Sequence, residues 1–213
     1  SERIPMVHLP VSDQELTDIL TQVDAILITH THRDHWDAVA QNSIEKSKTI
    51  FCQPSDLNKI KEIGFTNVTS ISDKHAFHGI RIDRTGGRHG SGDIGQRMGD
   101  VSGFVLTKGN KRIYVAGDTI WCDEVKSALN QFKPTYTILN AGGAQFNMGD
   151  PITMTDSDVI EVANAHPKGK LAAVHMDTIN HCMVTRAILK EKLAAKGLDK
   201  RVAIPEDGEQ FSI

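Results

Sequence analysis

The sequence predicts an α/β fold, in which short buried strands alternate with amphipathic helices. A capping-box pattern, Ser12-Asp13-Gln14-Glu15, should begin a helix, and the apolar run Ala25-Ile26-Leu27-Ile28 after it should form a buried strand. The same alternation of helix and strand signals continues to the end of the chain. With 213 residues, 39% hydrophobic and 24% charged, the chain suits a single domain over residues 1–213 with a sizeable core.

Each element in the first half of the chain has its own signal. The capping box precedes a periodic apolar pattern, and Gly64 is placed to end a later helix. We expect, in order, a helix over 12–23, a strand over 24–29, a strand over 49–52, a helix from about 55 to Gly64, a strand near 67–71 and an extended stretch over 78–84.

Turn and cap signals organise the second half. Gly109-Asn110 separates two apolar runs and predicts a hairpin, while Thr155 followed by Asp158 predicts a capped helix. We expect, in order, hairpin strands over 102–107 and 111–116, a helix over 122–132, a strand over 136–140, a helix from 155, a strand over 171–174, a helix over 184–196 ended by Gly197, and short strands over 201–204 and 210–213.

The charge balance disfavours polyanionic partners. Lysine and arginine (24) nearly balance aspartate and glutamate (27), and no Lys/Arg run is dense enough to indicate nucleic-acid or membrane binding. The sequence shows no membrane-spanning apolar stretch and no signal-peptide pattern, and Cys52, Cys122 and Cys182 have no C-x-x-C spacing. We therefore expect a cytoplasmic protein with reduced, packed thiols and a small-molecule partner; a homo-oligomer stays open.

A metal site is predicted directly after the first strand. The residues His30-Thr31-His32-Arg33-Asp34-His35 place three imidazoles and one carboxylate in one short stretch. These groups are ligands of borderline divalent ions such as zinc, and core packing does not require so many of them side by side. His30 and His32 share a face in extended backbone and can bind one ion, whereas Asp34 and His35 must follow a turn. The motif therefore predicts two ions.

Further ligands are expected where other strands end, because loops at that edge of an α/β sheet build the site. The strand over 111–116 runs into Gly117-Asp118-Thr119, and a carboxylate can bridge two cations with its two oxygens. The strand over 171–174 ends in His175, and His89 lies among glycines that leave room for close approach. We expect His30, His32 and His89 on one ion, Asp34, His35 and His175 on the other, and Asp118 between them.

One motif points to a different ligand. The segment Gly90-Ser91-Gly92-Asp93-Ile94-Gly95 matches the GxGxxG pattern of dinucleotide sites. No strand directly precedes it, and residues 96–100 contain too much glycine to open a helix, so we expect a loop here and no dinucleotide. Arg84, Arg88 and Arg97 flank this loop and could contact a substrate phosphate, although a solvated loop with scattered charges is the simpler interpretation.

The order of these motifs resembles the metallo-β-lactamase superfamily of metal-dependent hydrolases. The resemblance covers the chain from about Asp18 onward, and aspartate at position 118, together with the segments NAGGAQF, HMDTINHC and PEDGEQF, is most similar to the L-ascorbate-6-phosphate lactonase-like group. It implies an αββα sandwich. That family begins with a β-hairpin for which this sequence has no counterpart upstream of Ser12, so either that part lies outside the sequence or the first sheet is incomplete.

The predicted site supports hydrolysis. Two divalent ions, zinc or manganese, would lower the pKa of bound water, so that a bridging hydroxide can attack without a serine or cysteine nucleophile. The ions outweigh the charges of Asp34, Asp118 and the hydroxide, which favours a small anionic substrate with a lactone or phosphoester bond. Asp34 could also orient the nucleophile or take up its proton. His181 could donate a proton to the leaving group, but a position behind the site or at the surface is equally consistent.

Three other functions stay open. A nuclease similar to the tRNA 3′-processing members of the superfamily would need a basic arm, which the sequence lacks. A metal-binding scaffold would have a broken ligand set, and this set is complete. An iron protein that reduces oxygen or oxidises sulfur on the same fold is also open, because ligand types alone do not identify the metal.

The remaining candidate residues have weaker signals. Asn140 and the turn at Ala141-Gly142-Gly143 follow a strand and could line the pocket, although an ordinary turn explains them equally well. Trp121 and Cys122 are expected to pack. Four histidines lack a position at a strand end and are expected to be surface or incidental residues: His8, His75, His78 and His166.

Overall fold

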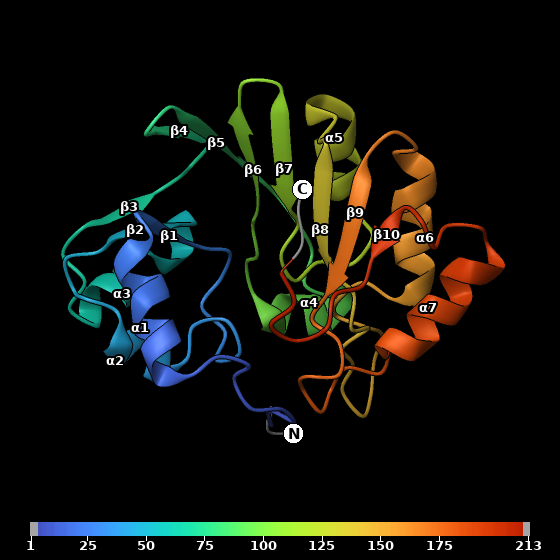
Figure 1. Ribbon diagram of the computed structural model, residues 1–213, viewed down its shortest axis with the longest axis horizontal. Coiled ribbons are helices and arrows are strands. Elements are labelled where there is room, and N and C mark those ends of the chain that lie inside the picture. Colours follow the sequence, from blue (N-terminus) through green and yellow to red (C-terminus); the bar gives the residue numbers. More distant parts are fainter. Residues whose placement is uncertain (1–3, 211–213) are drawn as a thin grey trace.

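The structure, a computed structural model, describes residues 4–210 and contains two β-sheets flanked by helices, an αββα sandwich (Figure 1). The smaller sheet is parallel, with order β1-β2-β3. Its strands are β1 (Ala25–Ile28), β2 (Thr49–Cys52) and β3 (Val68–Ser70), and its helices are α1 (Asp13–Gln22), α2 (Ala38–Ser43) and α3 (Leu57–Glu62), which a short 3-10 turn, Pro54–Asp56, precedes.

The larger sheet is mixed, with order β10-β9-β8-β7-β6-β5-β4. The strands β4 to β7 pair antiparallel, whereas β7 to β10 pair parallel. Its strands are β4 (Lys74–Phe77), β5 (Ile80–Thr85), β6 (Gly103–Lys108), β7 (Lys111–Val115), β8 (Tyr136–Asn140), β9 (Lys170–Val174) and β10 (Val202–Ala203), and its helices are α4 (Gly92–Met98), α5 (Asp123–Phe132), α6 (Asp156–Ala165) and α7 (Arg186–Ala195).

Three apolar clusters hold these layers together. The largest lies where α5, α6 and α7 pack on the large sheet, with Leu139 and Leu171 fully buried among the helix residues. A second cluster joins the small sheet to α2 and α3. The third contains Phe51 and Ile71 from the small sheet region and Phe104 from β6, so it joins the two sheets. Since burial of each large apolar side chain stabilises by about 1.5–3 kcal/mol, these contacts fix the relative position of the sheets.

Most elements lie where the sequence predicts them. The strand Tyr136–Asn140 has the predicted bounds, and both capping boxes form, at Ser12 and at Thr155. The prediction that residues 90–100 form only a loop is wrong, because Gly92–Met98 is a helix. The strand β4 and the short helix α2 were not predicted. The strand expected at 210–213 falls almost wholly outside the described residues.

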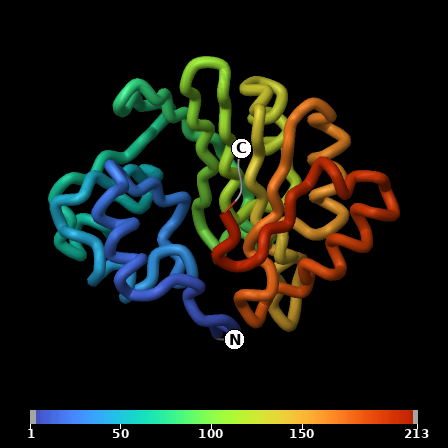
Figure 2. The backbone as a smooth tube through the Cα atoms, viewed as in Figure 1, coloured from blue at the N-terminus to red at the C-terminus, as the bar shows by residue number. Residues whose placement is uncertain are grey.

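The N-terminal end of the described chain lies beside the loop that follows β9 (Figure 2). The Met6 amide donates to the Thr178 carbonyl at 2.8 Å, and Pro5 forms a bridge with Ile179. Across residues 4–210, no β-hairpin precedes α1. The same residues include no helix that is both long and apolar enough to cross a bilayer.

Candidate metal centre

The strands deliver polar side chains to one edge of the molecule. In the large sheet β7, β8 and β9 run parallel, so their carboxyl ends meet. Asp118 follows β7, Asn140 is the last residue of β8, and His175 follows β9. In the small sheet, β1 ends two residues before His30. The two sheets therefore bring four chain segments together at this edge.

The loop after β1 is shaped by a turn at His32. The His32 carbonyl accepts hydrogen bonds from the amides of His35 (2.9 Å) and Trp36 (2.8 Å), which reverses the chain before Asp34 and His35. This is the turn that the motif predicts. It separates the side chains of His30 and His32 from those of Asp34 and His35.

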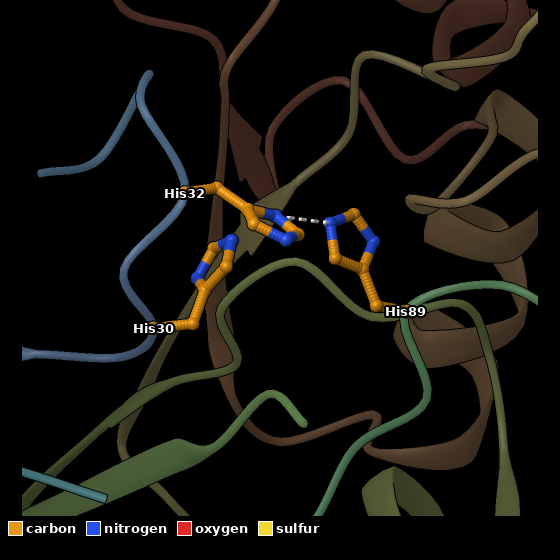
Figure 3. A group of neighbouring side chains, drawn as sticks. All are labelled: His30, His32 and His89. Atoms are coloured by element: carbon orange, nitrogen blue, oxygen red, sulfur yellow. Dashed lines mark hydrogen bonds between the residues drawn. The ribbon is translucent and has the colours of Figure 1, made fainter. Parts of the chain in front are cut away.

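The first group contains His30, His32 and His89, whose ring nitrogens lie within 4.8 Å of one another. Figure 3 shows His30 and His32 on one segment facing His89 on another, with His89 Nε2 3.2 Å from His32 Nδ1. The other nitrogen of His89, Nδ1, lies 2.8 Å from the Ile152 carbonyl, to which it donates. That hydrogen bond assigns the proton to Nδ1 and leaves the Nε2 lone pair directed at the group.

The second group contains Asp34, His35, Asp118 and His175, again with ligand atoms within 4.8 Å of one another. His175 Nε2 lies 3.4 Å from Asp34 Oδ2, and His35 Nε2 lies 3.6 Å from the same oxygen. The rings of His35 and His175 stack in nearly parallel planes with centroids 5.1 Å apart. All four side chains therefore face one small volume.

Asp118 lies between the two groups. Its Oδ2 is 3.7 Å from His30 Nε2, 3.5 Å from His89 Nε2 and 3.1 Å from His35 Nε2. The Asn140 side-chain amide donates to Asp118 Oδ1 at 2.6 Å and so fixes the carboxylate orientation. Asn140 thus has a defined contact in the site, beyond that of an ordinary turn residue.

The charges of the centre depend on these contacts. Burial, with the neighbouring imidazoles, lowers the pKa of His30 to about 2, so this ring is neutral. Burial alone would raise the pKa of Asp118, but the surrounding histidines bring it well below its usual value. Burial would lower the pKa of His175, but hydrogen bonds with Asp34 and Cys182 raise it to about 11; a bound cation would reverse this preference, because it repels the proton.

The residues fit a pair of divalent ions. His30 Nε2 is buried and has no hydrogen-bond partner among the described residues, although it faces the other ligand atoms. Such a group costs free energy unless something satisfies it. Imidazole and carboxylate ligands suit Zn²⁺ and Mn²⁺. The two clusters of His and Asp side chains are consistent with a binuclear metal site.

Backbone conformation supports the approach of these loops. Gly117 has φ +73°, and a Cβ there would lie 2.9 Å from the Ser102 carbonyl oxygen, so a side chain would clash with the backbone beside β6. His175 itself has φ 64°, an unusual conformation for histidine. A Cβ on Gly142 would lie 2.2 Å from the His175 carbonyl oxygen, so the glycine turn after β8 leaves room for this loop.

A buried network behind the first group was not predicted from the sequence. The Thr31 hydroxyl, between His30 and His32, donates to Asp56 at 2.8 Å, and Asp56 is only 2% exposed. The Gln53 side-chain amide donates to the other Asp56 oxygen at 2.8 Å. Asp56 therefore anchors the loop that carries both histidines. No motif signals it, because a single aspartate after a strand is commonplace.

His181 is only 5% exposed, so the surface interpretation is wrong. Its Nδ1 lies 2.6 Å from Asn180 Oδ1, and its ring meets Phe146 edge to face. Cys182, the next residue, has its Sγ 3.6 Å from His175 Nδ1. Cys182 therefore contacts the ring of a candidate ligand, which sequence reasoning also missed.

The other candidates have structural contacts. Trp121 and Cys122 pack in the largest core cluster, as expected. Arg84 donates to the Ser72 carbonyl and to Ser102, and Arg88 pairs with Glu124 at 3.0 Å. These contacts favour the simpler interpretation of both arginines. The four incidental histidines lie outside the two groups, although His166 is half-buried and its Nε2 contacts the Pro134 carbonyl at 2.8 Å.

Sequence comparison identifies the family. A family model described as the beta-lactamase superfamily domain matches residues 5–176, which contain every residue of both ligand groups. The chain belongs to this superfamily. Its membership agrees with the fold and with the strand-end position of the ligand groups.

Several beta-lactamase superfamily relatives match nearly the whole chain. The UPF0173 protein YddR of Bacillus subtilis (strain 168) is 37% identical over 98% of this chain and 82% of its own length. A solved structure described as an isothiocyanate hydrolase from Delia radicum gut bacteria is 38% identical, with a TM-score of 0.91 over 98% of this chain and 82% of that chain. A solved structure described as a possible metal-dependent hydrolase from Veillonella parvula is 37% identical, with a TM-score of 0.93 over 100% of this chain and 83% of that chain.

Proposed function

We propose that this protein is a dinuclear metal-dependent hydrolase that acts on a small molecule. The observation that carries the proposal is the position of Asp118, whose carboxylate lies within 4 Å of imidazole nitrogens from both ligand groups. One ion would be held by His30, His32 and His89 and the other by Asp34, His35 and His175, with Asp118 as the bridge. Zinc and manganese are the metals proposed first.

Ions held there would lower the pKa of a bound water toward neutrality and polarise the group under attack. Side chains of the protein would supply the remaining roles in hydrolysis, namely metal binding, orientation of the ligands and proton uptake. The neutral His30 ring has one nitrogen with a free lone pair for a metal ion, and Asn140 holds the orientation of Asp118. Asp34 has a side chain that is only 5% exposed and faces the second group, where it can take up a proton from the attacking water.

Among substrates, we place small electrophiles such as isothiocyanates first. The support is the relative described as an isothiocyanate hydrolase, which matches the chain at 38% identity over nearly its full length. Lactones and phosphoesters remain in the proposal because the motifs resemble the lactonase-like group. The hydrogen bonds of Arg84 and the ion pair of Arg88 count against a dedicated phosphate site.

The test is a substrate panel with protein that has been reconstituted with zinc or with manganese. The panel contains benzyl isothiocyanate, a six-membered lactone, a phosphate monoester, a phosphate diester and single-stranded RNA. We expect turnover of at least one small molecule, lost in Asp118→Ala and retained in Asp123→Ala, an exposed aspartate on α5. Faster cleavage of RNA than of any small molecule would contradict this proposal and favour a nuclease function instead. Two bound ions without turnover of any compound in the panel would favour a metal-binding scaffold without enzymatic activity.

A further inference from the structure

A largely apolar pocket lies between α4 and the loop 145–151, near the chain segments that carry His89 and His181. It has a volume of about 610 Å³. Its apolar lining comes from Ile94 and Met98 of the helix and from Phe146 and Met148 of the loop, and its polar lining comes from Asp93, Arg97 and Asn147. Pockets for small molecules commonly have about 300–1,000 Å³. Met148 is 82% exposed, so the pocket opens to solvent. Apolar surface of this kind at a loop is a feature of binding sites.

Two contacts connect this pocket to the centre. A Cβ on Gly90, the residue after His89, would lie 3.5 Å from Ile94 Cγ2, so the helix wall packs against the residue next to a candidate ligand. The Phe146 ring meets the His181 ring with centroids 5.1 Å apart and planes at 80°. One wall is therefore joined to the first ligand group, and the other is joined to His181.

The two walls also hold each other in place. Gly149 lies so close to Ile94 that a Cβ would overlap the end of the Ile94 side chain, and its φ of +99° is a backbone conformation that favours glycine. The Ser91 hydroxyl, at the start of α4, donates to the Asp150 carboxylate at 3.2 Å. The pocket is thus formed by packed segments from both sides.

A cavity of about 690 Å³ is lined by His89 and by charged residues such as Arg84, Arg88 and Glu124. Another cavity, of about 730 Å³, reaches Asp34, His35 and His175 from between the sheets. Its apolar lining comes from α1 and from strands such as β1 and β8, including Leu20 and Ile138, and it includes neither His89 nor His181. Its apolar part is formed by side chains on strand and helix faces, which pack as core surface, and only its end at Asp34, His35 and His175 belongs to the metal centre. Small-molecule sites in α/β folds lie in loops beyond the strand ends. The pocket at α4 has that position.

We propose that the pocket between α4 and the loop 145–151 binds the apolar substituent of the substrate while its electrophilic atom lies at the metal centre. This inference rests on the proposed function and specifies its substrate class. The protein should prefer small electrophiles that carry an aryl or alkyl group over compact polar ones. Met148, Phe146 and Met98 are the residues that determine this preference.

The experiment uses hydroxamates, which bind metal ions without being hydrolysed. Protein loaded with two zinc ions is titrated by calorimetry with acetohydroxamate and with phenylacetohydroxamate. Burial of the phenyl ring should make the second ligand bind about thirtyfold more tightly. Met148→Asp and Phe146→Ala should remove most of that ratio. Ile188→Asp, a control on α7 where the side chain is 40% exposed, should preserve it.

Each outcome has a separate meaning. Equal affinity of the two hydroxamates for the unaltered protein would overturn the pocket proposal and leave the metal centre intact. Binding of neither ligand to zinc-loaded protein would overturn the proposed function and the pocket proposal with it. A preference for the phenyl ligand that survives both pocket variants would also overturn the pocket, since the ring would then lie elsewhere.

Discussion

Asp118 shows how individual side chains define this centre. It follows β7 and accepts a hydrogen bond from Asn140, the last residue of β8. It also lies within 4 Å of nitrogens on His30, His89, His35 and His175. The sequence predicts this convergence because imidazole and carboxylate are rare side by side and because they stand at strand ends. It does not predict Asp56 or Cys182, because each acts only through a contact with another loop.

His181 is expected to contribute to turnover without binding metal. Replacement of its buried ring in His181→Ala should leave two bound ions but lower kcat by about 10²–10⁴, if the imidazole protonates the leaving group. Turnover is measured beside metal content, with His166→Ala as a matched control that lies outside both ligand groups. Unchanged turnover with full metal content would remove the catalytic role from His181.

Asp56 is expected to position the loop that carries His30 and His32. In Asp56→Asn one carboxylate oxygen becomes an amide that cannot accept from Thr31 and Gln53 together, so the apo protein should lose about 1–3 kcal/mol of unfolding free energy. Affinity for the first metal ion should also fall, as measured by competition with a chelator. Lys61→Ala is the control, since it changes an exposed lysine of α3. Wild-type metal affinity in Asp56→Asn would exclude a positioning role.

The predictions of helices and strands were wrong where the local residue pattern and the tertiary contacts disagree. Glycine in α4 suggests a broken helix, yet a Cβ on Gly95 would lie 2.7 Å from the Gly90 carbonyl oxygen, so glycine permits close packing there. The strand β4 carries a polar, half-exposed pattern and forms because it pairs with β5 across a turn at His78-Gly79, where both φ angles are positive. Such pairing is not visible in the strand's own residues.

The capping box of α6 provides a prediction for an element. Thr155 accepts from the Asp158 amide, and the Asp158 carboxylate accepts from the Thr155 amide at 2.9 Å. Thr155→Ala should therefore cost about 1 kcal/mol of unfolding free energy, measured by urea denaturation. Ser157→Ala, at an exposed position in the same turn, should change stability much less. Equal effects of the two substitutions would show that the cap contributes nothing specific.

The whole molecule should lose stability on the alkaline side. Burial raises the pKa of Cys52 from 9.0 to about 11 and also raises the pKa values of Tyr114, Cys122 and Tyr136. Each raised pKa means that the folded state retains a proton that the unfolded chain releases first. This contribution is complete below the unfolded pKa and is lost as pH rises from about 9 toward 11.

Urea denaturation at several pH values measures this loss. The free energy of unfolding should fall as pH rises above 9, and the fall should be shallower in Cys52→Ala, in which one of the titrating groups is absent. The comparison uses slopes, because Cys52→Ala also changes core packing at every pH. A constant unfolding free energy across this range would contradict the burial of these groups.

The most direct test of the central claim is the metal content of the reconstituted protein, measured by elemental mass spectrometry after removal of free ions. A site bridged by Asp118 predicts about two zinc or manganese ions per chain, a marked loss from Asp118→Ala, and no loss from Asp123→Ala, whose side chain is 78% exposed. No bound metal, or two ions retained in Asp118→Ala, would contradict a bridged dinuclear centre.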